Sequence, residues 1–224
     1  LPLAEGRRRA ALLLADRGLA DWEKKPIRTL SKGMAQTVQL LGALVHQPKL
    51  IRRCVHPARQ LLDQVAGKVP LLITEEGPVW DSLAIAEYLA ETYPEAHLWP
   101  RGEYARTVAR SVCAEMHSGF VALRTHLPMD LAHDQALVDT PAEALADIER
   151  IIALWTQCRM RFGADGAFLF GHASIVDAFF APVAARLRSY RVELPPLAAD
   201  YVATIYQWPA FQRWLQAALE EPSW

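Results

Sequence analysis

Cysteine is scarce in this 224-residue sequence, which has three well-separated thiols at Cys54, Cys113 and Cys158. They form no C-x-x-C pair and match no metal-ligand spacing, so we expect reduced thiols and no metal site. An excess of charge of either sign is also lacking, because 24 Lys and Arg residues stand against 25 Asp and Glu residues. No net field therefore attracts nucleic acid or an anionic membrane surface, and we expect neither as a partner.

Long hydrophobic runs are missing as well. No apolar stretch approaches the roughly 20 residues that a membrane-spanning helix needs, and the first residues lack the apolar core of a secretory signal. These absences predict a cytoplasmic protein. The sequence begins with Leu1 rather than Met, so we expect it to be an incomplete reading of a longer gene.

The most informative segment lies between Gly67 and Thr92. Its pattern predicts strands at about 69–74 and 78–80, a tight turn between them, and a helix that ends before Pro94. Proline cannot donate a backbone hydrogen bond, so Pro70 belongs at the start or edge of a strand and leaves neighbouring backbone groups free for a ligand. Asp81 and Ser82 can cap the helix, whose positive end favours a carboxylate nearby.

With these motifs the sequence resembles the glutathione transferases. The resemblance continues in order through WP at 99–100, AEMHSGF at 114–120 and FLFGHASIVDA at 168–178, and covers roughly residues 57 to 224. It implies that the backbone of Val69, followed by a cis Pro70, pairs with the cysteinyl part of glutathione, and that Asp81 and Ser82 hold the γ-glutamyl end. The implied glutathione-binding residues are Lys68, Val69, Pro70, Asp81 and Ser82. Taken alone, the two short motifs also allow a plain strand start and a plain helix cap.

The second part of the sequence predicts helices. We expect one helix from Tyr104 to about Leu127 and another from Ala142 to Phe162, with Thr140 as its cap and Pro141 in its first turn. Within the first helix, Met116, His117 and Phe120 resemble residues that face the acceptor-substrate cleft of the family. The alternative is a surface histidine beside a core methionine.

A capping box is predicted at Ser174–Asp177, with Asp in place of the usual Glu. It is a folding signal that starts the central helix, and we assign it a structural role rather than a catalytic one. The core of this helical domain is expected to include Trp155, Phe179 and Leu187.

The first fifty residues resemble a different family. The segment around LSKGMAQ at 30–36 and the helix that follows it resemble the signature region of an ABC-transporter ATPase, whose Ser and Gly amides contact the γ-phosphate of ATP. An apolar strand ending in Asp-Glu should follow residue 50, but IRRCVHPAR stands at 51–59. The sequence also contains no G-x-x-x-x-G-K-[ST] phosphate loop, so we expect no autonomous ATP hydrolysis.

The same junction removes the part of a transferase that activates the thiol. Members of that family open with a strand and helix carrying a Ser, Tyr or Cys that lowers the pKa of the glutathione thiol. Ser31 and Cys54 do not lie in such a strand-to-helix turn, so the catalytic residue is not identified. The junction near 51–58 indicates a gene fusion or an assembly error.

The predicted fold class is mainly α within α+β: a helical fragment at 1–50, a truncated thioredoxin-like half at 57–94 and an all-helical transferase domain at 95–224. The predicted function is that of a glutathione transferase-like protein, with glutathione as co-substrate, a small electrophile as substrate and impaired turnover. A homodimer fits the resemblance. The alternatives are a non-catalytic helical interaction or dimerisation module and an ABC-transporter ATP-binding fragment.

Overall fold

The computed structural model of the protein describes residues 70–74, 76–136 and 139–220. The chain divides into two units, Leu1–Ala35 and Gln36–Trp224, and every described residue belongs to the second. The predicted helical fragment at 1–50 lies outside the described residues. The predicted division at 57–94 and 95–224 stays a prediction.

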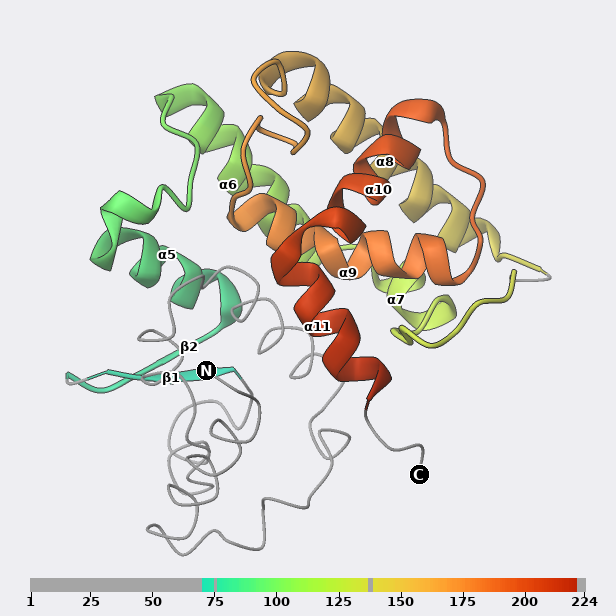
Figure 1. The fold of residues 1–224 in the computed structure, drawn as a ribbon, viewed down its shortest axis with the longest axis horizontal. Coiled ribbons are helices and arrows are strands. Elements are labelled where there is room, and N and C mark those ends of the chain that lie inside the picture. The colour runs from blue at the N-terminus through green and yellow to red at the C-terminus, as the bar shows by residue number, and fades with distance from the viewer. Residues whose placement is uncertain (1–69, 75, 137–138, 221–224) are drawn as a thin grey trace, which may run out of the picture. The chain divides into compact units, whose positions relative to one another are not determined.

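A small hairpin opens the described part of the chain (Figure 1). Strands β1 (Leu71–Ile73) and β2 (Pro78–Trp80) pair antiparallel, with Leu72 opposite Val79. The turn between them is closed by the Thr74 hydroxyl, which donates to the Gly77 carbonyl at 2.7 Å. Gly77 has a φ of 144°, a backbone conformation that side chains rarely allow. The two predicted strands are thus confirmed, the first in a shorter form.

Helix α5 (Ser82–Thr92) follows the hairpin, as the sequence predicts, and the short helix η3 (Pro94–Ala96) comes after it. Ile85 and Leu89 are buried on one face of α5 and pack with Leu72 of β1 in a small hydrophobic cluster. A spacing of four residues places both side chains on the same helix face. The hairpin is held against α5 by this cluster.

The predicted helix from Tyr104 to Leu127 is two helices, α6 (Glu103–Ser118) and α7 (Val121–His126). The break falls at Gly119 and Phe120, where Phe120 adopts a left-handed φ of 55°. A Cβ at Gly119 would lie 2.7 Å from the carbonyl oxygen of Glu115, so only glycine fits this tight end. The apolar periodicity continues across the break, which is why the pattern alone predicted a single helix.

Helix α8 spans Ala142–Phe162, as predicted, but Thr140 does not cap it. Pro141 occupies the cap position without a side-chain hydrogen bond, and its carbonyl accepts the amides of Ala144 and Leu145. Pro141 has an extended ψ of 146°, so it precedes the first helical residue, Ala142, and does not belong to the first turn. The predicted cap of α8 is therefore wrong by one position.

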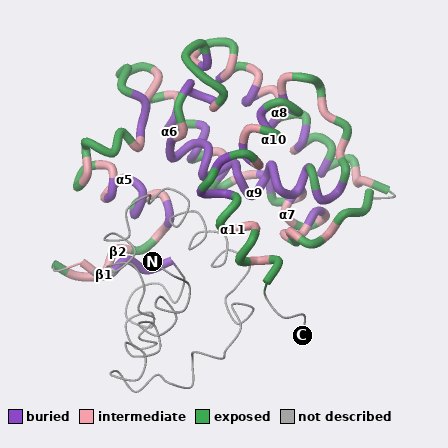
Figure 2. The backbone as a smooth tube through the Cα atoms, in the orientation of Figure 1, coloured by how far each residue is buried: buried purple, intermediate pink, exposed green. Residues whose placement is uncertain are grey.

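Helix α9 (Ile175–Ser189) forms the centre of the helical part, and every residue in it except Arg188 is buried (Figure 2). Helix α6 packs against α9, α7 against α8, and α10 (Pro196–Gln207) against both α8 and α9. Helix α11 (Pro209–Leu219), the last described helix, packs on α10 (Figure 1). A helix in a central position is expected to be mostly apolar around its whole circumference.

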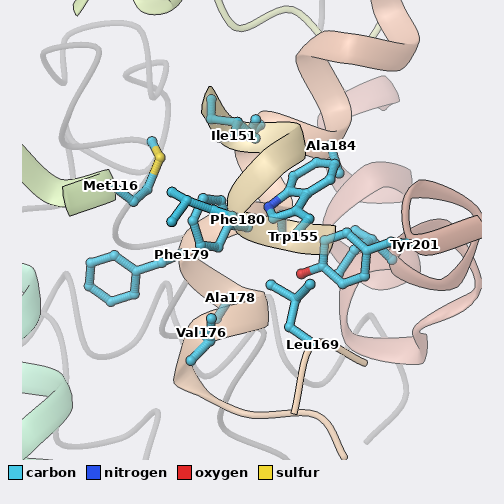
Figure 3. Packing of buried hydrophobic residues seen from close by; sticks show 14 of the residues in the cluster. Met116, Ile151, Trp155, Leu169, Val176, Ala178, Phe179, Phe180, Ala184 and Tyr201 are labelled. Carbon is cyan, nitrogen blue, oxygen red and sulfur yellow. The ribbon is translucent and has the colours of Figure 1, made fainter. Parts of the chain in front are cut away.

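One hydrophobic core joins these helices. Trp155 of α8 makes edge-on contacts with Phe180 of α9, at 5.8 Å between ring centroids, and with Tyr201 of α10, at 4.7 Å (Figure 3). Trp155, Phe179 and Leu187, the three predicted core residues, are all buried. Edge-to-face pairs add to the stabilisation from burial alone.

A buried polar network fixes the start of α9. The carboxylate of Asp177 accepts hydrogen bonds from the Ser174 amide at 2.9 Å and the Ser174 hydroxyl at 3.1 Å. It also accepts from the Leu169 amide at 3.1 Å and the Tyr201 hydroxyl at 3.0 Å. Burial raises the pKa of Asp177 to about 6, although these hydrogen bonds lower it. The network ties α9 to α10 and to the loop before α9.

The described residues contain seven α-helices and a two-stranded sheet. This is the predicted mainly helical architecture, in which part of a thioredoxin-like domain precedes an all-helical domain. Within the described ranges, none of the helices is long and apolar enough to span a bilayer.

Candidate functional site

The predicted glutathione-binding residues fall at the start of the described structure and at the start of α5. Lys68 and Val69 lie outside the described residues. Pro70 is buried immediately before β1. Asp81 and Ser82 lie next to each other where β2 ends and α5 begins. The structure therefore places three of the five residues, and two of these form one local site.

Asp81 holds an unusual backbone conformation, with a φ of 74° and a ψ of 133°. Its side chain is the N-cap of α5, because Oδ1 accepts the amide of Leu83 at 2.9 Å and that of Ala84 at 3.4 Å. These amides are among the groups that a helix cannot satisfy internally at its first turn. The sequence predicted the cap, but not the positive φ.

His117 of α6 reaches this helix start from the helical part of the chain. Its Nε2 lies 2.8 Å from Oδ2 of Asp81, and its Nδ1 lies 3.3 Å from the Ser82 hydroxyl oxygen. Side-chain exposure is 37% for His117 and 43% for Asp81, so the contact is open to solvent. The imidazole ring also lies edge-on to Phe179, with centroids 6.4 Å apart. One histidine thus bridges both residues predicted to hold the γ-glutamyl group.

A second contact between α5 and α6 keeps His117 close to the start of α5. Glu87 of α5 forms a bidentate pair with Arg110 of α6, at 2.6 and 2.9 Å, and accepts the indole N–H of Trp99 at 3.2 Å. The hydrogen bonds that Arg110 donates to Glu87 raise the pKa of Arg110. The Arg110 guanidinium also lies 5.6 Å from the centroid of the Trp99 ring. Two-point pairing of this kind fixes orientation as well as distance.

Met116 and Phe120, the other two residues predicted to face the acceptor cleft, are buried in the hydrophobic core. Figure 3 shows Met116 among these buried residues, together with Phe179. Their role in acceptor binding stays a prediction. The break after α6 is held by Arg124, which donates to the carbonyls of Met116 and Gly119.

Sequence reasoning missed two contacts that shape this region. The pairing of His117 with Asp81 joins residues 36 positions apart, and no local pattern predicts it. Asp147 of α8 accepts the amide of Leu123 at 2.9 Å and so caps α7 from another helix. Across the described ranges, no group of three or more His, Cys, Asp or Glu side chains is placed to hold a metal ion.

Comparisons with known proteins connect part of this chain to the glutathione transferases. The family model for the glutathione S-transferase N-terminal domain matches residues 46–91. A solved glutathione transferase homolog from Burkholderia GL BGR1, with bound glutathione, shares the fold at a TM-score of 0.58 and 19% identity, over 86% of this chain and 96% of that one. The family-model match is therefore confined to residues 46–91, and the likeness to the solved transferase shows a shared fold.

Two curated proteins also match parts of this chain. A stringent starvation protein A homolog from Coxiella burnetii is 25% identical over 173 residues, which is 74% of this chain and 78% of that protein. The aliphatic sulfonates import ATP-binding protein SsuB from Mycobacterium avium is 53% identical over 72 residues. That second match covers 32% of this chain and only 25% of the import protein. A short stretch therefore resembles a transporter ATPase.

Proposed function

We propose that this chain binds glutathione at the start of α5, with Asp81 and Ser82 holding the γ-glutamyl end. Val69 and Pro70 pair with the cysteinyl part, and Lys68 lies beside them in sequence. A small electrophile is the second substrate, and the assembly is a homodimer. The binding region lies within residues 57–94 and the helical domain within 95–224. The support comes from the family resemblance and from the geometry of Asp81.

The main observation in support of this proposal is the backbone conformation of Asp81. A non-glycine residue with φ of 74° costs on the order of 1–3 kcal/mol, and such strain persists where a function needs it. Here the conformation turns Oδ1 to the helix amides and leaves Oδ2 to face a second partner. An acceptor at that place suits the α-ammonium of a γ-glutamyl group, while the Ser82 hydroxyl and the helix start suit its carboxylate.

Turnover is expected to be weak, because no residue of this sequence matches the thiol-activating Ser, Tyr or Cys of the family. The two described thiols do not replace it. Burial raises the pKa of Cys158 to about 11 and that of Cys113 well above its ordinary value. A glutathione thiol with an unperturbed pKa of ~8.5 is only a few per cent ionised at neutral pH.

Two measurements test this proposal. Calorimetric titration with reduced glutathione should show weak binding that Ser82→Ala weakens further and Asp81→Asn removes. A steady-state conjugation assay with an aryl halide should show little turnover. Robust turnover abolished by Ser82→Ala would refute the impairment, and binding insensitive to both substitutions would refute the site.

The match to the import ATPase favours a second proposal, that the chain is a chimera whose residues 1–50 derive from an ABC-transporter ATP-binding protein. The resemblance around residues 30–36 and the identity of 53% over 72 residues support it. Sequencing genomic DNA across the codons for residues 45–60 tests this directly. An unbroken reading frame from an independent isolate would support a fusion gene, and a discontinuity would show an assembly error.

A further inference from the structure

His117 makes contacts that a γ-glutamyl ligand would otherwise make. Its ring joins Asp81 Oδ2 at 2.8 Å and the Ser82 hydroxyl at 3.3 Å. What we infer for His117 rests on the proposed function, since the same two residues are involved. Among the described contacts, this is the one that links the helical part of the chain to the start of α5 through polar atoms of both.

The hydrogen positions at this contact follow from the chemistry of the groups. An ionised carboxylate only accepts, so Nε2 of His117 carries the hydrogen that points at Asp81. In the neutral ring Nδ1 then has a lone pair, and the Ser82 hydroxyl donates to it. The other oxygen of Asp81 already serves the amides of Leu83 and Ala84. Both groups of the site are thus engaged in the free protein.

A γ-glutamyl end carries an ammonium, which donates, and a carboxylate, which accepts. The imidazole offers the same pair, because its Nε2–H donates to Asp81 and its Nδ1 accepts from Ser82. His117 therefore donates to Asp81 and accepts from Ser82, as the ammonium and carboxylate of the ligand would. The ligand ammonium and the imidazole N–H cannot both donate to Oδ2 of Asp81 from the same position.

We propose that His117 is an internal competitor that closes the γ-glutamyl subsite in the free protein and turns away when the ligand binds. The ligand class is that of compounds with a free γ-glutamyl α-amino and α-carboxylate group. The position is accessible, since the His117 side chain is 37% exposed. Its packing partner Phe179 offers only an edge contact at 6.4 Å between centroids, so the ring can leave without opening the core.

The expected effect is modest because the pair is open to solvent. Exposed ion pairs contribute little, and a site that is closed part of the time binds with an affinity reduced by its open fraction. Removing the ring should therefore tighten glutathione binding by about two- to five-fold. His117→Ala removes both nitrogens and leaves a good helix former in α6.

His126→Ala is the matched control. His126 of α7 is similarly exposed, at 34%, and its Nε2 also lies near a carboxylate, 3.3 Å from Glu143 Oε1. It lies away from Asp81 in the chain and pairs with a different helix. A general effect of removing an exposed histidine would appear in both variants.

The experiment is a calorimetric titration of the full chain, its His117→Ala and His126→Ala variants, and the double variant His117→Ala with Asp81→Asn. The ligands are reduced glutathione and the dipeptide Cys-Gly, which lacks the glutamyl group. We expect His117→Ala alone to tighten glutathione binding and to leave the Cys-Gly titration unchanged. In the double variant with Asp81→Asn, we expect no increase in glutathione affinity.

Three results would overturn the inference. If the parent chain binds glutathione and His117→Ala binds it equally or more weakly, His117 does not compete, and the proposed glutathione site remains. An equal gain with Cys-Gly or with His126→Ala would also show that the effect does not concern the glutamyl subsite. If neither the parent nor His117→Ala binds at millimolar glutathione, the proposed function fails and the inference fails with it.

Discussion

Replacing Asp177 by alanine removes the acceptor at the centre of the buried network that starts α9. Oδ1 of Asp177 accepts the Leu169 amide and the Tyr201 hydroxyl, and Oδ2 accepts the amide and hydroxyl of Ser174. Asp177 and Ser174 have no exposed surface, and Tyr201 is 1% exposed. Water therefore cannot reach the donors without opening the helix start.

The expected loss is the difference between two opposing contributions. Two buried amides without acceptors cost about 1–3 kcal/mol each, and two lost hydroxyl bonds cost about 1 kcal/mol each. Removing a buried carboxylate gives some of this back: a pKa raised from 3.8 to about 6 corresponds to about 3 kcal/mol at neutral pH. The free energy of unfolding should therefore fall by about 3 kcal/mol, within a range of about 1–5.

The pH dependence of this loss has a definite sign. The pKa of Asp177 in the folded state is about 6, above its ordinary value of 3.8, so the folded state binds more protons between these values. Stability from this group is fully present below about pH 3.8 and is lost as the pH rises through about 6. The difference in unfolding free energy between the parent and Asp177→Ala should therefore grow by about 1 kcal/mol from pH 7 to pH 5.

Denaturant unfolding followed by circular dichroism measures both effects. Asp200→Ala is the control, because Asp200 is an exposed acid on α10 whose backbone carbonyl, not its side chain, accepts from Thr204. The control should change stability by no more than about 0.5 kcal/mol. An Asp177→Ala variant as stable as this control, or a parent-to-variant difference that shrinks as the pH falls to 5, would refute the reasoning.

Three further predictions concern the helix ends and the buried thiols. Ser174→Ala should lower the unfolding free energy by about 1 kcal/mol through loss of the α9 cap, and an unchanged denaturation midpoint would contradict this. Gly119→Ala should cost about 1–3 kcal/mol, because its Cβ would lie 2.7 Å from the Glu115 carbonyl oxygen; thermal melting at or above the parent temperature would argue against it. Burial raises the pKa of Cys158 to about 11 and raises that of Cys113, so both should resist iodoacetamide in the folded protein and react in denaturant, as peptide mass spectrometry would reveal.

Local patterns in the sequence were sufficient for most of the helical part. The span Ala142–Phe162 was predicted with both ends, because apolar residues recur there at helical spacing. The start of α9 was predicted from the capping box of Ser174 and Asp177, which lie three positions apart in the sequence. The hairpin and the cap at Asp81 were predicted for the same reason. In each case the deciding hydrogen bonds join residues within one turn of the chain.

Where the deciding contact was not visible in the apolar pattern, the prediction failed. The break at Gly119 and Phe120 was missed because the apolar spacing continues across it, while the stop depends on a close approach of Gly119 to the carbonyl of Glu115. The cap of α8 was assigned to Thr140 because a threonine before proline is typical of a cap, while Pro141 itself takes that position in an extended conformation.

The candidate site depends on both kinds of information. Asp81 and Ser82 could be found from the sequence, because their types and order carry the resemblance to the transferases. The bridge from His117 could not, since it exists only after α6 packs beside α5 through Glu87 and Arg110. The sequence by itself determined which residues open the helix and cap its amides. Only the tertiary structure decided that an imidazole from a distant helix would lie on them, because that contact depends on the packing of two helices and not on the spacing along either.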